Sequence, residues 1–287
     1  MKLTGSARLA GIMGWPVGHS RSPALHNFWL EEHGIDGVYV PLAVPPERLE
    51  QALRALPALG FRGCNLTIPH KQAALAIIDR VEPVARRIGA VNTIIVGDDG
   101  TLEGRNTDAY GFREHLRESA AGWNPHAGAA VVLGAGGAAR AVVAALDEAG
   151  VEEICLVNRT VARAETLARD LADGRARISV HAWDTRNSVL REAGLLVNTT
   201  SLGMDKQPPL DLDLAALPHA AVVVDIVYAP LETGLLAAAR RRGHPVVDGL
   251  GMLLHQGRPG FEAWFGAKVA VTPQLRAAIL ETLAGPG

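Results

Sequence analysis

Apolar segments of strand length alternate with helix-length amphipathic segments through the first third of the chain. Buried strands are predicted at residues 9–14, 37–44 and 61–66, where apolar side chains run together between turn residues. Helices are predicted at residues 22–33, 46–56 and 69–78. Pro23 directly behind Ser22 is typical of a helix start with Ser22 as the N-cap. The alternation predicts an α/β domain.

A hairpin and then a breaker-rich loop follow this first series. Residues 90–97 and 101–106 are extended runs on either side of the tight turn Asp98-Asp99-Gly100, which predicts a hairpin. The loop GWNPHAG at residues 122–128 predicts a linker. A second alternating series comes after it, with strands at 129–133, 152–158, 177–183, 195–200, 221–228 and 245–250 and helices at 138–149, 160–173 and 231–242. Continuous β-branched runs are typical of strands buried on both faces, so we expect two α/β units with parallel sheets.

Composition and charge narrow the classes of protein. A chain of 287 residues suits two domains. A net charge of −2 and a pI of about 6.6 provide no basic field for nucleic acid or an anionic membrane. No run of about 18 uncharged apolar residues occurs, so we expect no transmembrane helix and a cytoplasmic location. Cys64 and Cys155 lie in separate apolar strands, which favours reduced core thiols over a disulfide, and no metal site is predicted.

A glycine-rich turn stands between the first strand and the first helix of the second series. The segment VVLGAGGAARAVVAAL places Gly134, Gly136 and Ala139 where the G-x-G-x-x-G/A motif has its small residues. Gly134 permits the tight turn, Gly136 lets the backbone approach a pyrophosphate, and the N–H groups of the helix that follows face it. The predicted dinucleotide contacts in this turn are Gly134, Ala135, Gly136, Gly137 and Ala138.

The end of the next strand distinguishes NADP from NAD. Rossmann proteins that prefer NAD usually carry an acidic residue there for the ribose 2′-hydroxyl. This chain has Asn158, Arg159 and Thr160 instead, with Arg163 a turn further on. A guanidinium can bind a 2′-phosphate through two hydrogen bonds and stack on adenine. The sequence therefore predicts NADP (NADPH), although Thr160 could also serve only as a helix cap.

The predicted fold is α/β, with an N-terminal α/β domain followed by a Rossmann domain. Helices predicted at residues 250–265 and 273–283 have no strands of their own, and we expect them to return to the first domain. The predicted boundaries are residues 1–108 with 250–287 for the first domain and 109–249 for the Rossmann domain.

Polar residues are concentrated near the ends of the strands in the first half, where α/β proteins bind ligands. Each has an ordinary structural explanation when taken alone, such as a helix cap or a solvated lysine. These residues are Ser20, Ser22, Asn65, Thr67, Lys71, Asn92, Asn106, Thr107 and Asp108.

Nine motifs resemble those of the shikimate dehydrogenase family, in the family's order and over nearly the whole chain. They are GWPVGHSRSPALHN, GFRGCNLTIPHK, GAVNT, GRNTDAYG, GAGGAARA, NRT, NTTSLGM, VVDIVYAPLET and DGLGMLLHQG. The resemblance implies a substrate domain followed by a Rossmann domain, with the C-terminal helices returning to the first. It also implies the NADPH-dependent reduction of 3-dehydroshikimate to shikimate, a step of aromatic amino-acid biosynthesis.

The resemblance also implies roles for individual residues. Lys71 and Asp108 would be the catalytic pair, because hydride delivery to a ketone requires a proton donor at the carbonyl oxygen. Contacts to the substrate carboxylate would come from Ser20, Ser22 and Tyr228, and contacts to its ring hydroxyls from Thr67, Asn92 and Gln256. The loop from Asn198 would lie near the nicotinamide. The residues implied at that end of the cofactor are Thr200, Ser201, Met204, Ile226, Gly249 and Met252. Leu66 and Gly257 depart from the family's usual Val and Ala.

Three other interpretations remain open at this stage. One is a quinate/shikimate dehydrogenase that uses NAD, against which the Asn158-Arg159-Thr160 triplet and the two serines weigh. Another is a paralogue specific for aminoshikimate, with a similar polar set. The third is a cofactor-sensing regulator without catalysis, which would have no need for Lys71 and Asp108 together. We expect a small-molecule substrate, no nucleic-acid or membrane partner, and a monomer or homodimer.

Overall fold

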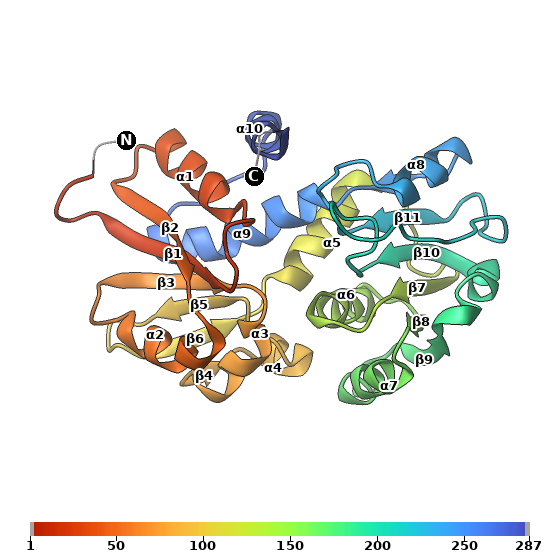
Figure 1. The fold of residues 1–287 in the computed structure, drawn as a ribbon, viewed down its shortest axis with the longest axis horizontal. Helices are drawn as coiled ribbons and strands as arrows, with labels where there is room; N and C mark the ends of the chain where they lie inside the picture. The colour runs from red at the N-terminus through yellow and green to blue at the C-terminus, as the bar shows by residue number, and fades with distance from the viewer. Residues whose placement is uncertain (1–2, 285–287) are drawn as a thin grey trace. The chain divides into compact units, whose positions relative to one another are not determined.

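Two units divide residues 3–284, the part of the chain that the computed structural model describes (Figure 1). The first unit runs to Thr107 and resumes at Leu253, and the second is Asp108–Met252. Within the described residues no helix is long and apolar enough to cross a membrane, and no three His, Cys, Asp or Glu side chains group as metal ligands.

The first unit is built on a six-stranded mixed sheet with the strand order β2-β1-β3-β5-β6-β4. Its strands are β1 (Arg8–Gly14), β2 (Gly37–Ala43), β3 (Phe61–Leu66), β4 (Arg80–Val81), β5 (Thr93–Val96) and β6 (Leu102–Arg105). Strand β1 is parallel to β2 and β3, whereas β5 is antiparallel to both β3 and β6. The parallel pairing expected of the alternating strands is confirmed for β1, β2 and β3, and the predicted hairpin is confirmed as β5 and β6. The sheet is mixed because the hairpin turn is too short for a parallel crossover.

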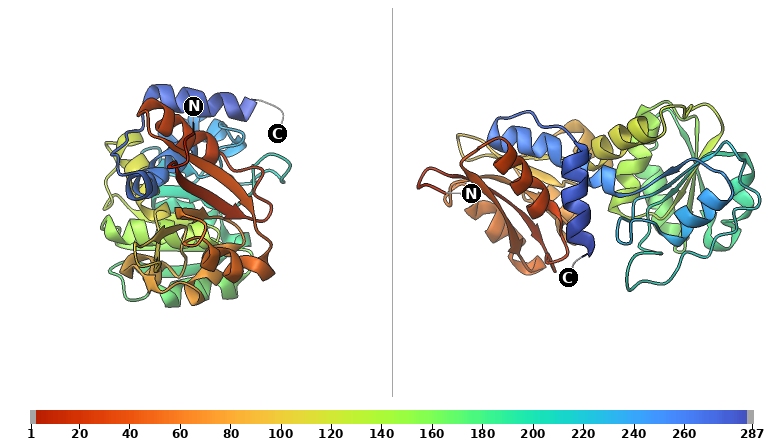
Figure 2. Two further views of the ribbon diagram at one scale, coloured as in Figure 1. Left: turned by 90° about the vertical axis from the view of Figure 1, so that its left-hand side faces the viewer. Right: turned by 90° about the horizontal axis from the view of Figure 1, so that it is seen from above.

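Helices cover both faces of this sheet. One face packs on α2 (Leu49–Ala55), the short α3 (His70–Ala73) and α4 (Pro83–Ile88), around a core that contains Leu53, Cys64 and Ile94. The other face packs on α1 (Ser22–Glu32) and α9 (Leu250–Phe265). Helix α10 (Pro273–Ala284) lies beside α1 (Figure 2).

Two tryptophans tie the C-terminal segment to the first unit. The indole of Trp29 on α1 donates to the carbonyl of Ala270 (3.1 Å), and that of Trp264 on α9 donates to Ile94 on β5 (2.9 Å). Phe261 on α9 stacks edge-on against Trp29. The expected return of the last helices to the first domain is confirmed.

The local predictions in the first unit fail at two places. Helix α1 begins at Ser22 with Arg21 at the N-cap and no capping side chain, so Ser22 is not the N-cap. The helix predicted at residues 69–78 has only one α-helical turn, α3, followed by a 3₁₀ turn at Ala74–Ala76. It stops because the backbone of Asp79 bonds to Leu102 and the chain enters β4 beside β6. The short elements β4 and α4 were not predicted.

The second unit contains a fully parallel sheet with the order β12-β11-β10-β7-β8-β9. Its strands are β7 (Ala129–Leu133), β8 (Glu153–Asn158), β9 (Arg177–Ala182), β10 (Ala193–Asn198), β11 (Val222–Asp225) and β12 (Val246–Val247). Read from β9, the order along the chain is 3-2-1-4-5-6, the doubly wound Rossmann arrangement. The predicted Rossmann fold and all six of its strands are confirmed.

Helices flank this second sheet as well. Helix α8 (Gly234–Arg241) covers one face, where Val131, Val157 and Leu236 belong to one buried cluster. Helices α6 (Gly137–Glu148) and α7 (Val161–Asp170) follow β7 and β8, and α5 (Asp108–Ser119) packs on α6.

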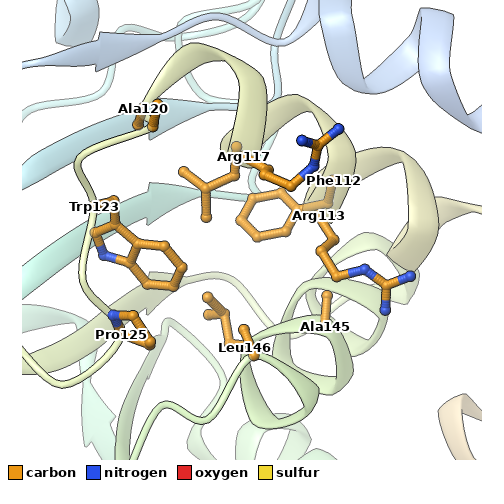
Figure 3. A pocket seen from close by; sticks show the side chains of 11 residues that line it. Phe112, Arg113, Arg117, Ala120, Trp123, Pro125, Ala145 and Leu146 are labelled. Carbon is orange, nitrogen blue, oxygen red and sulfur yellow. The ribbon is translucent and has the colours of Figure 1, made fainter.

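The predicted linker at residues 122–128 lies inside this unit. Trp123 and Pro125 there line an apolar pocket between α5 and α6, across from Leu146 (Figure 3). None of the residues lining this pocket is among the predicted site residues.

Candidate active site

The strands of the first unit bring most of its predicted site residues to one edge of the sheet. Ser20 and Ser22 follow β1, Thr67 and Lys71 follow β3, Asn92 precedes β5, and Thr107 follows β6. Because β5 runs antiparallel to β3, the start of β5 and the end of β6 lie at the edge where β1 and β3 end. Chemistry-bearing side chains from four strands therefore share this edge.

Hydrogen bonds with uncharged groups hold Asn92 at this edge. Its Oδ1 accepts from the backbone N–H of Thr107 (2.8 Å) and from the hydroxyl of Thr93 (3.0 Å), and its Nδ2 donates to the hydroxyl of Thr107 (3.1 Å). All three side chains are buried. Asn92 thus fixes the segment that leads directly into Asp108, the buried first residue of α5.

A second set of bonds extends this network through Tyr39 to Ser22. The Tyr39 hydroxyl donates to Asn65 Oδ1 (2.6 Å), and Asn65 Nδ2 donates to the carbonyl of Asn92 and to the hydroxyl of Thr93 (both 3.0 Å). Burial raises the pKa of Tyr39 well above its usual value, partly opposed by a hydrogen bond with Ser22. The Ser20 hydroxyl accepts from the backbone N–H of Ser22 (3.2 Å).

Backbone bonds place Lys71 beside this network. The carbonyl of Lys71 accepts from the N–H of Val91, the residue before Asn92 (2.8 Å), and the N–H of Thr67 donates to Met13 on β1 (2.9 Å). Lys71 is half-buried. Gln256, the remaining predicted substrate contact in this unit, is half-buried on α9. At the next residue, Gly257, a Cβ would come within 2.8 Å of Leu25 on α1. This close contact accounts for glycine in place of the family's usual Ala.

His26, which follows the serines in the first motif, is not placed to act as a base. Its ring is fully buried and stacks on Tyr39 with 4.1 Å between centroids. Burial lowers its pKa to about 3. The ring therefore stays neutral at physiological pH and acts as part of the aromatic core.

In the second unit, the turn between β7 and α6 suits a phosphate group. Gly134 has φ +108°, and a Cβ there would lie 2.7 Å from Thr199 Oγ1, so only glycine fits. At Gly136 and Gly137 a Cβ would meet nothing within 4 Å, so the protein's own packing does not require glycine there. Gly136 is the N-cap of α6 and supplies no capping side chain. This leaves backbone N–H groups at an open helix N-terminus, which is the environment that a pyrophosphate requires.

The end of β8 presents two exposed arginines next to that turn. In residues 3–284 neither Arg159 nor Arg163 forms an ion pair, and both are exposed. Thr160 occupies the N-cap of α7 with extended geometry, but its hydroxyl makes no capping bond. Asn158 donates to the carbonyl of Thr160 (2.7 Å). The hydroxyl and both guanidiniums are thus available to a ligand, and the residues present fit a 2′-phosphate.

Most of the predicted nicotinamide contacts, and the predicted substrate contact Tyr228, follow the carboxyl ends of β10 and β11, whereas Gly249 and Met252 follow β12. Asn198 Oδ1 accepts from the N–H (3.0 Å) and the hydroxyl (2.7 Å) of Thr200, and the carbonyl of Asn198 accepts from Ile226 (3.1 Å). A Cβ on Gly249 would lie 2.3 Å from the carbonyl oxygen of Ile226, which explains the glycine. Ser201 and Met204 are exposed in the loop after β10, Tyr228 is half-buried after β11, and Met252 is buried on α9.

Asp225 is the residue of this cluster that the sequence analysis did not single out. It ends β11, is fully buried, and accepts hydrogen bonds from Asn198, Val227 and Thr233. A lone carboxylate within the apolar run AVVVDIVY was the signal that could have identified it.

Comparison with known proteins agrees with this geometry. Residues 12–94 match the family model described as shikimate dehydrogenase substrate binding domain, and residues 118–205 match shikimate / quinate 5-dehydrogenase. The shikimate dehydrogenase (NADP(+)) of Paramagnetospirillum magneticum is 62% identical over 278 residues, which cover 97% of this chain and 100% of that protein.

Two solved structures share the fold along nearly the whole chain. A shikimate 5-dehydrogenase from Thermus thermophilus, crystallised with NADP(H) and shikimate, has a TM-score of 0.84 at 41% identity and covers 96% of this chain and 99% of its own. A quinate dehydrogenase from Corynebacterium glutamicum, crystallised with NAD, has a TM-score of 0.89 at 32% identity with coverages of 96% and 99%. The chain belongs to the shikimate dehydrogenase family.

Proposed function

We propose that this chain is an NADP-dependent shikimate dehydrogenase that reversibly reduces 3-dehydroshikimate to shikimate in the route to chorismate and the aromatic amino acids. The observation that carries this proposal is that two exposed arginines, Arg159 and Arg163, form no ion pair within residues 3–284 and lie beside an open helix N-terminus. These arginines favour NADP over NAD because guanidinium groups bind a 2′-phosphate, and the 62% identity to a protein named for NADP(+) supports this choice.

In the proposed reaction, the bound cofactor supplies a hydride to the ketone carbon. Lys71 donates a proton from Nζ to the carbonyl oxygen and takes it back in the reverse direction. Asp108 is proposed to orient the ammonium of Lys71. Asn92 supports this pairing, since it bonds to Thr107 and its backbone neighbour Val91 bonds to Lys71.

Neutral groups are proposed to hold the substrate. Ser20, Ser22 and Tyr228 would bind its carboxylate, and Thr67, Asn92 and Gln256 its ring hydroxyls. Hydroxyl and amide groups suit such a substrate, because an analogue that lacks a partner leaves a buried polar group unsatisfied.

For the cofactor, we propose that the turn Gly134–Ala138 binds the pyrophosphate and that Asn158, Arg159, Thr160 and Arg163 bind the 2′-phosphate. Thr200, Ser201, Met204, Ile226, Gly249 and Met252 are proposed to line the nicotinamide end. Residues 1–108 with 250–287 would then form the substrate-binding domain and residues 109–249 the NADP-binding domain. A cytoplasmic location and a monomer or homodimer complete the proposal, and sedimentation velocity measures the assembly state.

Steady-state assays of shikimate and quinate, each with NADP⁺ and with NAD⁺, test the proposal. Shikimate with NADP⁺ should have the highest kcat/KM of the four pairs. A preference for quinate with NAD⁺ would favour the catabolic alternative, and turnover of aminoshikimate above shikimate would favour that paralogue. Binding of NADP⁺ without turnover of any of these substrates would favour the regulator.

A further inference from the structure

The end of β11 holds a buried carboxylate whose partners are all neutral. Asp225 Oδ1 accepts from Asn198 Nδ2 (2.9 Å) and from the backbone N–H of Val227 (3.0 Å), and Oδ2 accepts from the Thr233 hydroxyl (2.7 Å). Asp225 and Asn198 have no exposed surface, and Thr233 is 1% exposed. No cation pairs with Asp225 within residues 3–284.

Fold stability alone gives no reason for a carboxylate at this position. Burial raises the pKa of Asp225 to about 6, opposed in part by the three hydrogen bonds. At neutral pH the group is ionised, and a buried anion with only neutral partners is less favourable than a well-packed apolar side chain. The presence of Asp225 at this position therefore needs an explanation other than the stability of the fold.

Those bonds reach the two loops that carry the proposed nicotinamide contacts. Asn198 uses its second amide hydrogen for the carbonyl of Leu202 (3.2 Å) and its oxygen for Thr200, so it shapes the loop after β10. Val227 and Thr233 stand on either side of Tyr228 in the loop after β11. Thr233 is also the N-cap of α8, where its hydroxyl accepts from Leu236 (3.3 Å).

The topology of the sheet places this cluster at the nicotinamide end. A Rossmann sheet binds the two halves of its dinucleotide on either side of the point where strand order reverses, here between β7 and β10. Arg159 ends β8 in the adenosine half, so the ends of β10 and β11 belong to the other half.

We propose that Asp225, acting through Asn198 and Thr233, is a positioning residue that sets the shape of the loops holding the nicotinamide. This proposal rests on the proposed function. The charge of Asp225 has a second consequence, since the nicotinamide ring is cationic in NADP⁺ and neutral in NADPH. A fixed anion at this end favours the oxidised form relative to the reduced form and thereby assists hydride donation.

Substitutions at Asp225 and Thr233 separate geometry from charge. Asp225→Asn keeps an oxygen for Asn198 and Val227 and can donate to Thr233, so it removes the charge and retains most of the geometry. Asp225→Ala removes both. Thr233→Val removes the hydroxyl and leaves the Asp225 side chain in place, whereas Thr233→Ser retains a hydroxyl at this position. Asp147→Asn is the matched control, because Asp147 is a buried carboxylate of the same unit that accepts from the N–H groups of Arg175 and Ala176, before the start of β9.

The measurement is the dissociation constant of the protein for NADP⁺ and for NADPH, without substrate, together with the melting temperature. Asp225→Asn should raise the ratio of the NADP⁺ constant to the NADPH constant about 3- to 10-fold, the effect of one partly screened charge. Asp225→Ala and Thr233→Val should each weaken the binding of both forms about 5-fold or more, and Thr233→Ser should bind like wild type. Asp147→Asn should lower the melting temperature and leave both constants unchanged.

The proposal is overturned if folded Asp225→Ala or Thr233→Val binds both cofactor forms within about twofold of wild type, or if Asp225→Asn leaves the ratio unchanged. If Asp225→Ala does not fold, Thr233→Val and Asp225→Asn decide the matter. Wild-type turnover of shikimate is assayed separately. A wild-type protein that fails that assay refutes the proposed function, whereas the binding constants refute or support the role of Asp225.

Discussion

The two sheets of this protein present their ligand-binding edges in opposite ways. In the first unit the polar side chains are bonded to one another before any ligand arrives, as Asn92, Thr107 and Asn65 illustrate. At the adenosine end of the second unit Arg159 and Arg163 are exposed beside the open turn at Gly136, and neither forms an ion pair within residues 3–284. Apart from the proposed catalytic pair Lys71 and Asp108, the first edge is neutral and preorganised, whereas the second is charged and open.

The difference corresponds to the chemistry of the two proposed ligands. A small hydroxyl-rich acid offers many weak hydrogen bonds, and these discriminate only if the partners are fixed in place. A phosphate carries charge that attracts guanidinium groups strongly even when they are exposed. Substitutions in the two edges should therefore impair activity or ligand binding in distinguishable ways. Four predictions test this difference.

The largest effect is expected at Lys71. Lys71→Ala removes the proposed proton donor, so kcat for shikimate oxidation should fall by about 10²–10⁴-fold while the dissociation constant for NADPH changes little. Lys268→Ala is the control, because Lys268 is an exposed lysine of the same unit. A Lys71→Ala enzyme that keeps most of its turnover at neutral pH would show that Lys71 is not the general acid.

Arg159 should produce the next largest change, and only for one cofactor. Arg159→Ala should lower kcat/KM for NADP⁺ by about 2–3 kcal/mol, roughly 30- to 150-fold, and leave NAD⁺ nearly unchanged. Adding Asn158→Asp should shift preference further toward NAD⁺, since a carboxylate repels the phosphate and accepts from the ribose hydroxyl. Arg169→Ala, at an exposed arginine on α7, serves as the control. Equal losses with both cofactors would contradict the role of Arg159.

The pH dependence of stability tests the charge of Asp225, the buried carboxylate at the end of β11 in the second unit. The folded pKa of Asp225 is about 6, above its usual 3.8, so protonation stabilises the folded state. This stabilisation is complete below about pH 4 and is lost as the pH rises through about 6. Between about pH 4.5 and about pH 7.5, the unfolding free energy of Asp225→Asn should therefore gain about 2 kcal/mol relative to wild type. Urea unfolding of both proteins measures this difference, and parallel pH profiles would refute it.

The smallest effect is expected at Ser22, in the neutral edge. Ser22→Ala should lower kcat/KM for shikimate by about 1–2 kcal/mol, roughly 5- to 30-fold, with an unchanged NADPH constant. Because Ser22 does not cap α1, its loss should cost little helix stability. A large drop in melting temperature with proportional losses for both ligands would indicate a folding defect instead.

Sequence patterns predicted the second unit far better than the details of the first. The run AAVVL was predicted as a strand and is β7, and the glycine motif lies between β7 and α6 as expected. These features are local, because residues close in sequence determine them. The antiparallel pairing of β5 with β3 and the early end of α3 depend on contacts between distant segments, such as that of Asp79 with Leu102.

In the candidate site, the residue types could likewise be predicted from the sequence, whereas the hydrogen bonds between distant segments could not. The residue types of the family motifs identified Lys71, Asn92 and Arg159 as candidates, and their positions follow from strand ends. The network that fixes Asn92 and the bonds of Asp225 could not be predicted in full, since the bonds of Asn92 to Thr107 and of Asp225 to Asn198 join residues 15 and 27 positions apart. A buried aspartate in an apolar strand signals a special environment but does not identify its partners.

The salt dependence of the two affinities tests the contrast between the edges most directly. The dissociation constant for NADPH and the KM for shikimate at saturating NADP⁺ are measured on the wild-type protein from about 0.1 M to about 1 M salt, over which the Debye length falls from about 10 Å to about 3 Å. The exposed arginines predict that the NADPH constant rises more than about fivefold, while the neutral groups proposed to bind shikimate predict that its KM changes less than about twofold. Parallel changes in the two values, or an NADPH constant independent of salt, would contradict the account.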